Sequence, residues 1–140
     1  YPKSYLPHDI PSCLFGKERG IIAIVGFGSM GQVAFEAGRI LKEENIDVES
    51  FAFCRIKPID ERIKEIVSKF DFIVSVEENT LIGGAGSGIL EYLNDRKIVK
   101  NILRIGLPDK FIEQGERKFL LEKYGLTPEK VAQKVKDFIK

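Results

Sequence analysis

The stretch Val76–Leu93, VEENTLIGGAGSGILEYL, joins three patterns in an order that indicates a strand followed by a helix. It starts at the end of an apolar run and continues with two carboxylates, Glu77 and Glu78. A glycine-rich turn occupies residues 83–88, and apolar residues recur after it at helical spacing. A buried strand, a glycine turn and an amphipathic helix account for this order.

The same order of patterns occurs closer to the N-terminus. Ile21–Val25 is a continuous apolar run, as in a strand that is buried on both faces. The glycine-rich segment Gly26-Phe27-Gly28-Ser29-Met30-Gly31 follows it. A helix is predicted to continue to about Glu44, because apolar residues form one stripe along it and polar residues lie opposite.

Strand and helix patterns alternate along the remaining chain. Further strands are predicted at Val48–Phe53, Phe72–Val76 and Ile102–Ile105. Further helices are predicted after the N-cap Asp60, from Ser87 to Asn94, from Glu116 to Tyr124, and after the N-cap Thr127 with Pro128 at the first helical position. The sequence therefore predicts a three-layer α/β/α, doubly wound fold. We expect a mainly parallel sheet with core strand order 2-1-3-4 and room for a short antiparallel edge strand around Cys13–Phe15.

The chain is predicted to hold one domain, at residues 13–140. Residues 1–12 contain three prolines and no helical period, so they are interpreted as a linker or arm from a preceding domain. The chain begins with Tyr1 and its single methionine is Met30. We therefore expect it to be a piece of a longer polypeptide whose N-terminal domains are missing here.

Composition argues against several classes of function. The 22 Lys and Arg residues nearly balance the 21 Asp and Glu residues, which disfavours nucleic-acid and membrane-surface partners. Cys13 and Cys54 form no disulfide framework or metal motif, and His8 stands alone, so reduced thiols in a cytoplasmic protein are expected. No apolar run is long enough to span a bilayer.

The first glycine segment has two interpretations. Gly26, Gly28 and Gly31 match the dinucleotide-binding fingerprint, in which a pyrophosphate approaches a helix N-terminus. The acidic residue expected about twenty positions later is missing, although Arg55 could suit a 2′-phosphate. The alternative is that these glycines let the helix pack closely on the sheet. In doubly wound sheets, ligands favour the crevice between two such loops, which here lies near Gly26 and Gly84.

Glu77 and Glu78 also have two interpretations. Two carboxylates beside a helix N-terminus resemble a general acid/base pair, but that role needs a nearby substrate and perturbed pKa values. Contacts that cap the loop or form an interface are the alternative. The chain has no Gly-Lys-Ser/Thr phosphate loop, no G-x-S-x-G elbow and no Gly-Asp-Gly segment. No catalytic, cofactor-binding or metal residue is therefore assigned within this chain.

Four stretches together resemble the C-terminal domain of the 1-deoxy-D-xylulose-5-phosphate synthase family, thiamine-diphosphate enzymes related to transketolase. They are AIVGFGSM from Ala23, RIKPID from Arg55, the stretch Val76–Leu93, and GLPDKFIEQG from Gly106. Order and spacing agree over nearly all of residues 21–140. The C-terminal domains of transketolase and of 2-oxo-acid dehydrogenase β-subunits share the fold and are weaker alternatives.

The resemblance implies a function for the whole protein. Members of the family condense pyruvate with glyceraldehyde 3-phosphate, with loss of carbon dioxide, and so start non-mevalonate isoprenoid synthesis and feed thiamine and pyridoxal synthesis. Thiamine diphosphate supplies the carbanion chemistry, and Mg²⁺ anchors its diphosphate. Both are held by the preceding domains. The resemblance implies that the third domain packs against these domains and contributes to a homodimer, and that it is inactive alone.

One substrate-binding residue follows from the resemblance. Family members carry a Tyr-Pro-Arg stretch before this domain, and its arginine approaches the phosphate of glyceraldehyde 3-phosphate. The present chain has Tyr1-Pro2-Lys3 at that place. A lysine meets a phosphate as a point charge but lacks the bidentate fork of arginine. Lys3 is therefore expected either to contact the substrate phosphate less specifically than an arginine or to be a linker lysine in water.

Overall fold

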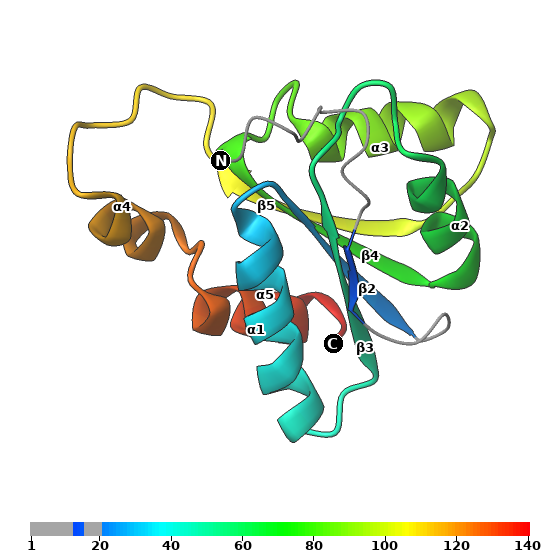
Figure 1. The fold of residues 1–140 in the computed structure, drawn as a ribbon, viewed down its shortest axis with the longest axis horizontal. Coiled ribbons are helices and arrows are strands. Elements are labelled where there is room, and N and C mark those ends of the chain that lie inside the picture. The colour runs from blue at the N-terminus through cyan, green and yellow to red at the C-terminus, as the bar shows by residue number, and fades with distance from the viewer. Residues whose placement is uncertain (1–12, 16–20) are drawn as a thin grey trace, which may run out of the picture.

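The computed structural model describes residues 13–15 and 21–140 of the chain, and side chains from residue 21 onward. These residues form a five-stranded sheet with helices on both faces (Figure 1). The strands are β1 (Cys13–Phe15), β2 (Ile22–Phe27), β3 (Val48–Phe53), β4 (Phe72–Thr80) and β5 (Asn101–Leu107). The helices are α1 (Met30–Glu43), α2 (Glu61–Lys69), α3 (Ala85–Asp95), α4 (Arg117–Tyr124) and α5 (Pro128–Phe138).

The sheet has the order β1-β3-β2-β4-β5. The four strands β3, β2, β4 and β5 are parallel, which confirms the predicted core order 2-1-3-4. The short strand β1 pairs with β3 in the antiparallel direction, as predicted for the sheet edge. The predicted linker at residues 1–12, including Lys3, lies outside the described residues.

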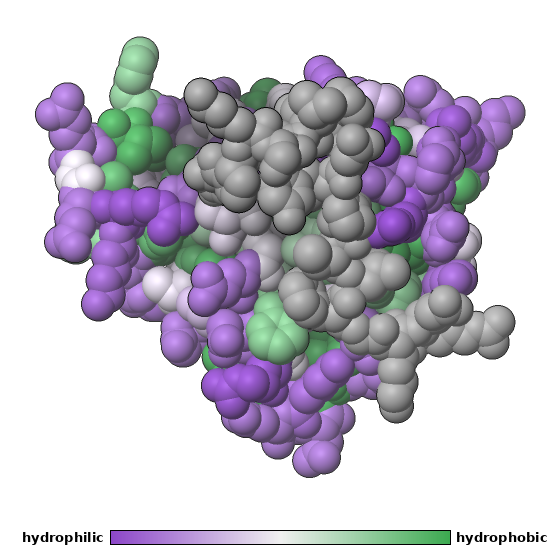
Figure 2. All heavy atoms as spheres, viewed as in Figure 1, coloured by the Kyte–Doolittle hydropathy of each residue, from purple (hydrophilic) through white to green (hydrophobic). Residues whose placement is uncertain are grey.

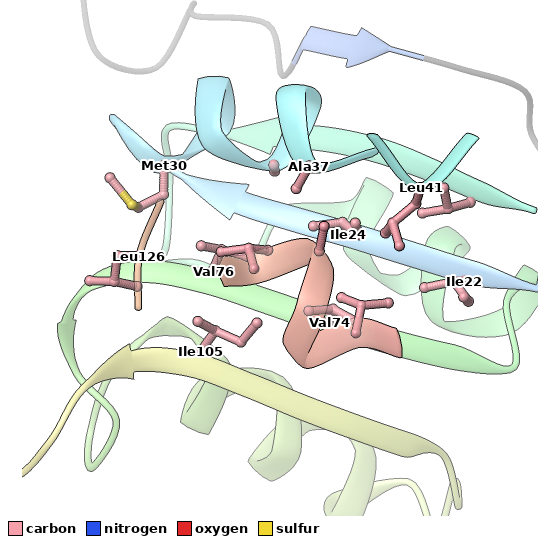
Figure 3. Close-up of a cluster of buried hydrophobic side chains, with 14 residues drawn as sticks. Ile22, Ile24, Met30, Ala37, Leu41, Val74, Val76, Ile105 and Leu126 are labelled. Atoms are coloured by element: carbon pink, nitrogen blue, oxygen red, sulfur yellow. The ribbon is translucent and has the colours of Figure 1, made fainter. Parts of the chain in front are cut away.

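Two hydrophobic cores fill the space between the sheet and its helices. Every residue of β2 is buried, and its side chains alternate between the two faces. Ile22 and Ile24 face the core under α1 and α5, which also contains Met30 and Leu41 of α1 (Figure 3). Ala23 and Val25 face the second core, under α2 and α3. The stripe predicted for α1 therefore lies against the sheet.

The predicted starts of α2 and α5 agree with the structure, and that of α3 does not. Helix α3 begins at Ala85 rather than at Ser87, because the Glu77 side chain holds its first backbone N–H groups. Thr127 precedes α5 as predicted, but its side chain makes no capping hydrogen bond, and Oγ1 is buried without a hydrogen-bond partner. Asp60 caps α2 as predicted, since its Oδ1 accepts a hydrogen bond of 3.0 Å from the Arg62 N–H.

Candidate functional site at the carboxyl ends of the strands

Both glycine loops leave the carboxyl ends of neighbouring parallel strands, β2 and β4. A hollow of about 320 Å³ lies between the first loop and β4. It is lined by Phe27, Gly28, Ser29, Cys54, Ile56, Glu77, Glu78 and Asn79. A second hollow of about 350 Å³ adjoins the second loop, and Ile56 lines both. The expected crevice is therefore present as two hollows.

The glycines of the first loop serve packing and turn geometry. A methyl group on Gly26 would overlap the backbone of Met30 and Gly31, and one on Gly31 would lie 2.7 Å from the Ala52 Cβ of β3. Gly28 has a φ of 58°, which favours glycine, and its N–H donates to the Phe53 carbonyl at 2.8 Å. Helix α1 thus lies close to the sheet, as the packing interpretation predicts.

A carboxylate occupies the space in front of α1. Glu78 Oε2 accepts a hydrogen bond of 2.8 Å from the Ser29 hydroxyl at the start of that helix. Arg117 of α4 donates to both carboxylate oxygens of Glu78, at 2.8 and 2.6 Å. The hydrogen bonds from Arg117, and secondarily the one from Ser29, lower the pKa of Glu78, although partial burial opposes them. Glu78 is therefore held as an anion where a pyrophosphate would approach α1.

Glu77 caps the helix that follows the second loop. The β4–β5 pairing shifts register between Val76 and Thr80, so that β4 bends at this point. The Glu77 carboxylate is 2% exposed and accepts hydrogen bonds from the backbone N–H groups of Ala85, at 2.6 Å, and Gly86, at 3.0 Å. A negative charge at a helix N-terminus is stabilised by the helix dipole. The prediction of loop-capping contacts is therefore confirmed for Glu77.

The second loop is fixed by further contacts. A side chain on Gly84 would overlap the Glu77 carboxylate, and Gly83 has a φ of 74°. Arg104 of β5 donates from Nη1 to the Leu81 carbonyl at 2.8 Å and to the Ser87 hydroxyl at 2.9 Å. The glycines of this loop therefore make room for a buried carboxylate and for a tight turn.

These contacts limit the chemistry available at the carboxyl edge. Glu77 and Glu78 both have fixed hydrogen-bond donors, so neither is placed as a general acid or base. Arg55 lies 3.8 Å from Asp60 Oδ2, so it already has an anionic neighbour. Among residues 21–140, no group of three or more side chains could hold a metal ion. In the same residues, no helix is long and apolar enough to cross a bilayer.

The fold and this edge define the class of the protein. It is a doubly wound α/β domain whose strand-end loops are held by internal hydrogen bonds. A family model described as "Transketolase, C-terminal domain" matches residues 14–131. The chain belongs to the transketolase C-terminal domain family.

Two similar curated proteins share one name. A protein of Caldanaerobacter subterraneus subsp. tengcongensis named 1-deoxy-D-xylulose-5-phosphate synthase is 43% identical over 115 residues, which cover 81% of this chain and 18% of the relative. One of the same name from Dictyoglomus thermophilum is 43% identical over 122 residues, covering 86% of this chain and 19% of the relative. The chain therefore spans about a fifth of the length of these relatives.

Solved structures agree on the fold. A chain titled "Split gene transketolase, inactive beta4 tetramer" superposes with a TM-score of 0.76 at 32% identity, over 97% of this chain and 46% of that chain. A transketolase mutant from Pichia stipitis superposes with a TM-score of 0.66 at 18% identity, over 91% of this chain and 18% of that chain.

Sequence reasoning placed the loops but missed two of the residues that hold them. Arg104 lies in the predicted strand Ile102–Ile105 and Arg117 in the predicted helix Glu116–Tyr124, and neither pattern predicts a contact with a loop. The sequence around each arginine gives no sign of these contacts. The order of the strands brings Arg104 to Leu81, and the path of the chain after β5 brings Arg117 to Glu78. An arginine inside a largely apolar strand was the one available hint for Arg104, since buried arginines are usually paired.

Proposed function

We propose that this chain is the C-terminal domain of a thiamine-diphosphate-dependent synthase that condenses pyruvate with glyceraldehyde 3-phosphate to 1-deoxy-D-xylulose 5-phosphate. The supporting observation is 35–43% identity, over more than four fifths of the chain, to proteins named for that activity. Identity to the two solved transketolases is lower, at 32% for the split-gene protein and 18% for the one from Pichia stipitis. The expected setting is a cytoplasmic homodimer that supplies isoprenoid, thiamine and pyridoxal synthesis.

Within this enzyme, the domain has an assembly role. Thiamine diphosphate with Mg²⁺ needs free carboxylate and carbonyl oxygens around the metal. The carboxylates at the strand ends, Glu77 and Glu78, are instead committed to α3 and to Arg117. The described residues do not fit that cofactor, and no reaction step is assigned to them. The cofactor and the metal belong to other domains of the enzyme.

The remaining assignments concern the N-terminal part. Residues 1–12 are proposed to be the connection from a preceding domain, and residues 13–140 to be the single C-terminal domain. Lys3 is proposed to contact the phosphate of glyceraldehyde 3-phosphate in the assembled enzyme. An ammonium group can attract that phosphate without the two parallel hydrogen bonds of an arginine.

Reading the coding sequence upstream of Tyr1 tests the proposed function. A Gly-Asp-Gly segment is expected there or in a neighbouring open reading frame. The assembled enzyme should form 1-deoxy-D-xylulose 5-phosphate from the two substrates when thiamine diphosphate and Mg²⁺ are supplied. The 140-residue chain alone should form none. Turnover by the chain alone, or no turnover by the assembled enzyme, would contradict the proposal.

A substitution at Lys3 tests the phosphate contact separately. In the assembled enzyme, Lys3→Met is expected to raise the KM for glyceraldehyde 3-phosphate roughly tenfold, the worth of one charge-assisted contact. The KM for pyruvate should stay unchanged, and Lys3→Arg should retain or improve the wild-type value. Equal KM values in Lys3→Met and wild type would remove Lys3 from the site.

A further inference from the structure

Residues 108–124 form a segment that differs from the rest of the domain. After β5, residues 108–116 have no regular structure, and α4 follows them. Helix α4 contributes no buried residue, whereas α1, α2, α3 and α5 each contribute several. In Figure 1 the segment extends away from the sheet. We call residues 108–124 the α4 segment.

The α4 segment exposes two phenylalanines. Phe111 is fully exposed and Phe119 is 61% exposed. Figure 2 shows green, hydrophobic side chains at the upper left, where Figure 1 places this segment. Large aromatic side chains contribute most when buried and contribute little in water. The two phenylalanines therefore add little to the stability of the domain as it stands.

Polar contacts nevertheless hold the segment in place. Arg117 binds Glu78 at the end of β4, as described above. Glu113 accepts hydrogen bonds from Lys123 and, at 2.6 Å, from the Tyr124 hydroxyl. These bonds, first the one from Lys123 and then the one from Tyr124, lower the pKa of Glu113 to about 2. An eight-residue helix is marginal in water alone, so such contacts are needed to keep it ordered.

The core side of the segment is anchored as well. Leu121 packs, partly buried, against the core under α1 and α5. Gly125 ends α4 in the left-handed conformation, and the N–H of the buried Leu126 donates to the Leu121 carbonyl at 2.8 Å. The segment is thus preorganised, with one side docked and its phenylalanines directed outward. Preorganisation lowers the entropy cost of a later contact.

We infer that Phe111 and Phe119 form the contact surface for another domain of the same enzyme. This inference rests on the proposed function. The chain spans about a fifth of its relatives' length, so most of such an enzyme lies outside it. The segment also adjoins the strand-end hollow through Glu78, at the edge where doubly wound domains bind their ligands.

Contact area favours another domain over a second copy of this chain. Two phenylalanines bury roughly 300–500 Å² when covered. A stable complex between separate proteins needs about 800 Å² on each side. Domains of one enzyme are held at high effective concentration, so a smaller contact is sufficient between them.

Amide hydrogen exchange of the full-length enzyme and of the 140-residue chain tests this inference. Amides of residues 108–124 are expected to exchange at least about tenfold more slowly in the full-length enzyme, as hot-spot contacts of aromatic residues imply. The double substitution Phe111→Ser and Phe119→Ser should abolish this difference. It should leave the melting temperature of the 140-residue chain unchanged, because both side chains are exposed.

The matched control is Val99→Ser. Val99 is 94% exposed and precedes the amino end of β5, at the opposite edge of the sheet. It should leave the exchange of residues 108–124 unaltered. Equal exchange in both proteins would overturn the inference, and so would protection that appears in the 140-residue chain at high concentration, which would indicate a second copy. Either result in an enzyme that forms 1-deoxy-D-xylulose 5-phosphate would leave the proposed function intact.

Discussion

The two glycine loops at the carboxyl edge follow buried parallel strands and precede helices, yet they stabilise those helices differently. At the first loop, Ser29 makes no capping hydrogen bond to α1, and its hydroxyl donates outward to Glu78. At the second loop, the buried Glu77 carboxylate binds two N–H groups of α3. The Glu77 carboxylate thus caps the N-terminus of α3. The N-terminus of α1 instead faces the Glu78 carboxylate, whose charge Arg117 balances.

This difference explains why a glycine fingerprint alone does not define a phosphate site. A phosphate needs free N–H groups and an electrostatic environment without competing anions. At the first loop the anion is Glu78, and at the second it is Glu77. The glycines remain necessary, since Gly26 and Gly31 permit close packing and Gly84 makes room for a carboxylate.

The largest effect is expected from adding a methyl group at the first loop. Gly26→Ala should lower the free energy of unfolding by about 3 kcal/mol, because the new atom meets the backbone of Met30 and Gly31. Gly88→Ala is the matched control, since nothing lies within 4 Å of a methyl group there. It should raise stability by about 0.5 kcal/mol through helix propensity. Urea unfolding followed by circular dichroism measures both, and a cost below about 1 kcal/mol for Gly26→Ala would refute the packing role.

At the second loop, removal of the buried carboxylate should come next in size. Glu77→Ala leaves the N–H groups of Ala85 and Gly86 without their acceptor, at a cost of about 2–3 kcal/mol. The neighbouring Glu78→Ala should cost only about 0.5 kcal/mol, because its ion pair is largely exposed. Urea unfolding measures both costs. A smaller loss of unfolding free energy for Glu77→Ala than for Glu78→Ala would contradict the capping role.

The stability contributed by the Glu78–Arg117 ion pair at the first loop should decrease at low pH. The pKa of Glu78 is lowered in the folded protein, first by the hydrogen bonds from Arg117. Its contribution is therefore present above the unfolded pKa, about 4.3, and is lost as pH falls through the folded value. Arg117→Met should cost about 0.5 kcal/mol at pH 7, because Arg117 is more than half exposed, and almost nothing at pH 2.

Lys118→Met provides the control for that measurement. It removes the same charge from the adjacent position of α4. In urea unfolding, the difference in unfolding free energy between this variant and wild type should be the same at both pH values. NMR titration should show a normal Glu78 pKa in Arg117→Met and a lowered one in Lys118→Met. A depressed Glu78 pKa that persists in Arg117→Met would assign the shift to Ser29 instead.

Much of the fold was predictable because local patterns and topology rules agree. The apolar runs around Ile24 and Val74 mark strands buried on both faces, and right-handed crossovers restrict their order. Element ends were less accurate. Strand β4 runs to Thr80 rather than to Val76, because the register shift lets Glu77 turn inward while the strand continues. Hydrophobic periodicity contains no signal for such a bend.

The candidate site was predictable only in part, because its partners are remote in sequence. Glu77 caps a helix that begins only eight residues later, so this contact could be predicted from the local sequence. Arg117 is separated from Glu78 by 39 positions, and only the path after β5 brings them together. The exposed state of Phe111 and Phe119 was also beyond sequence reasoning, since phenylalanine is among the residues most often buried.

The smallest effect is expected from nucleotides at the first loop. NADPH and NADH, titrated by calorimetry, should show no saturable binding up to about 1 mM, which means affinity weaker than about −4 kcal/mol. The reason is the Glu78 carboxylate beside Ser29, together with the existing Asp60 neighbour of Arg55. Inorganic pyrophosphate should give the same result, because it isolates the anion contact from the base and sugar. Micromolar binding of NADPH that Arg55→Met abolishes would instead make this loop a nucleotide site, and the two loops would then differ in function as well as in stabilisation.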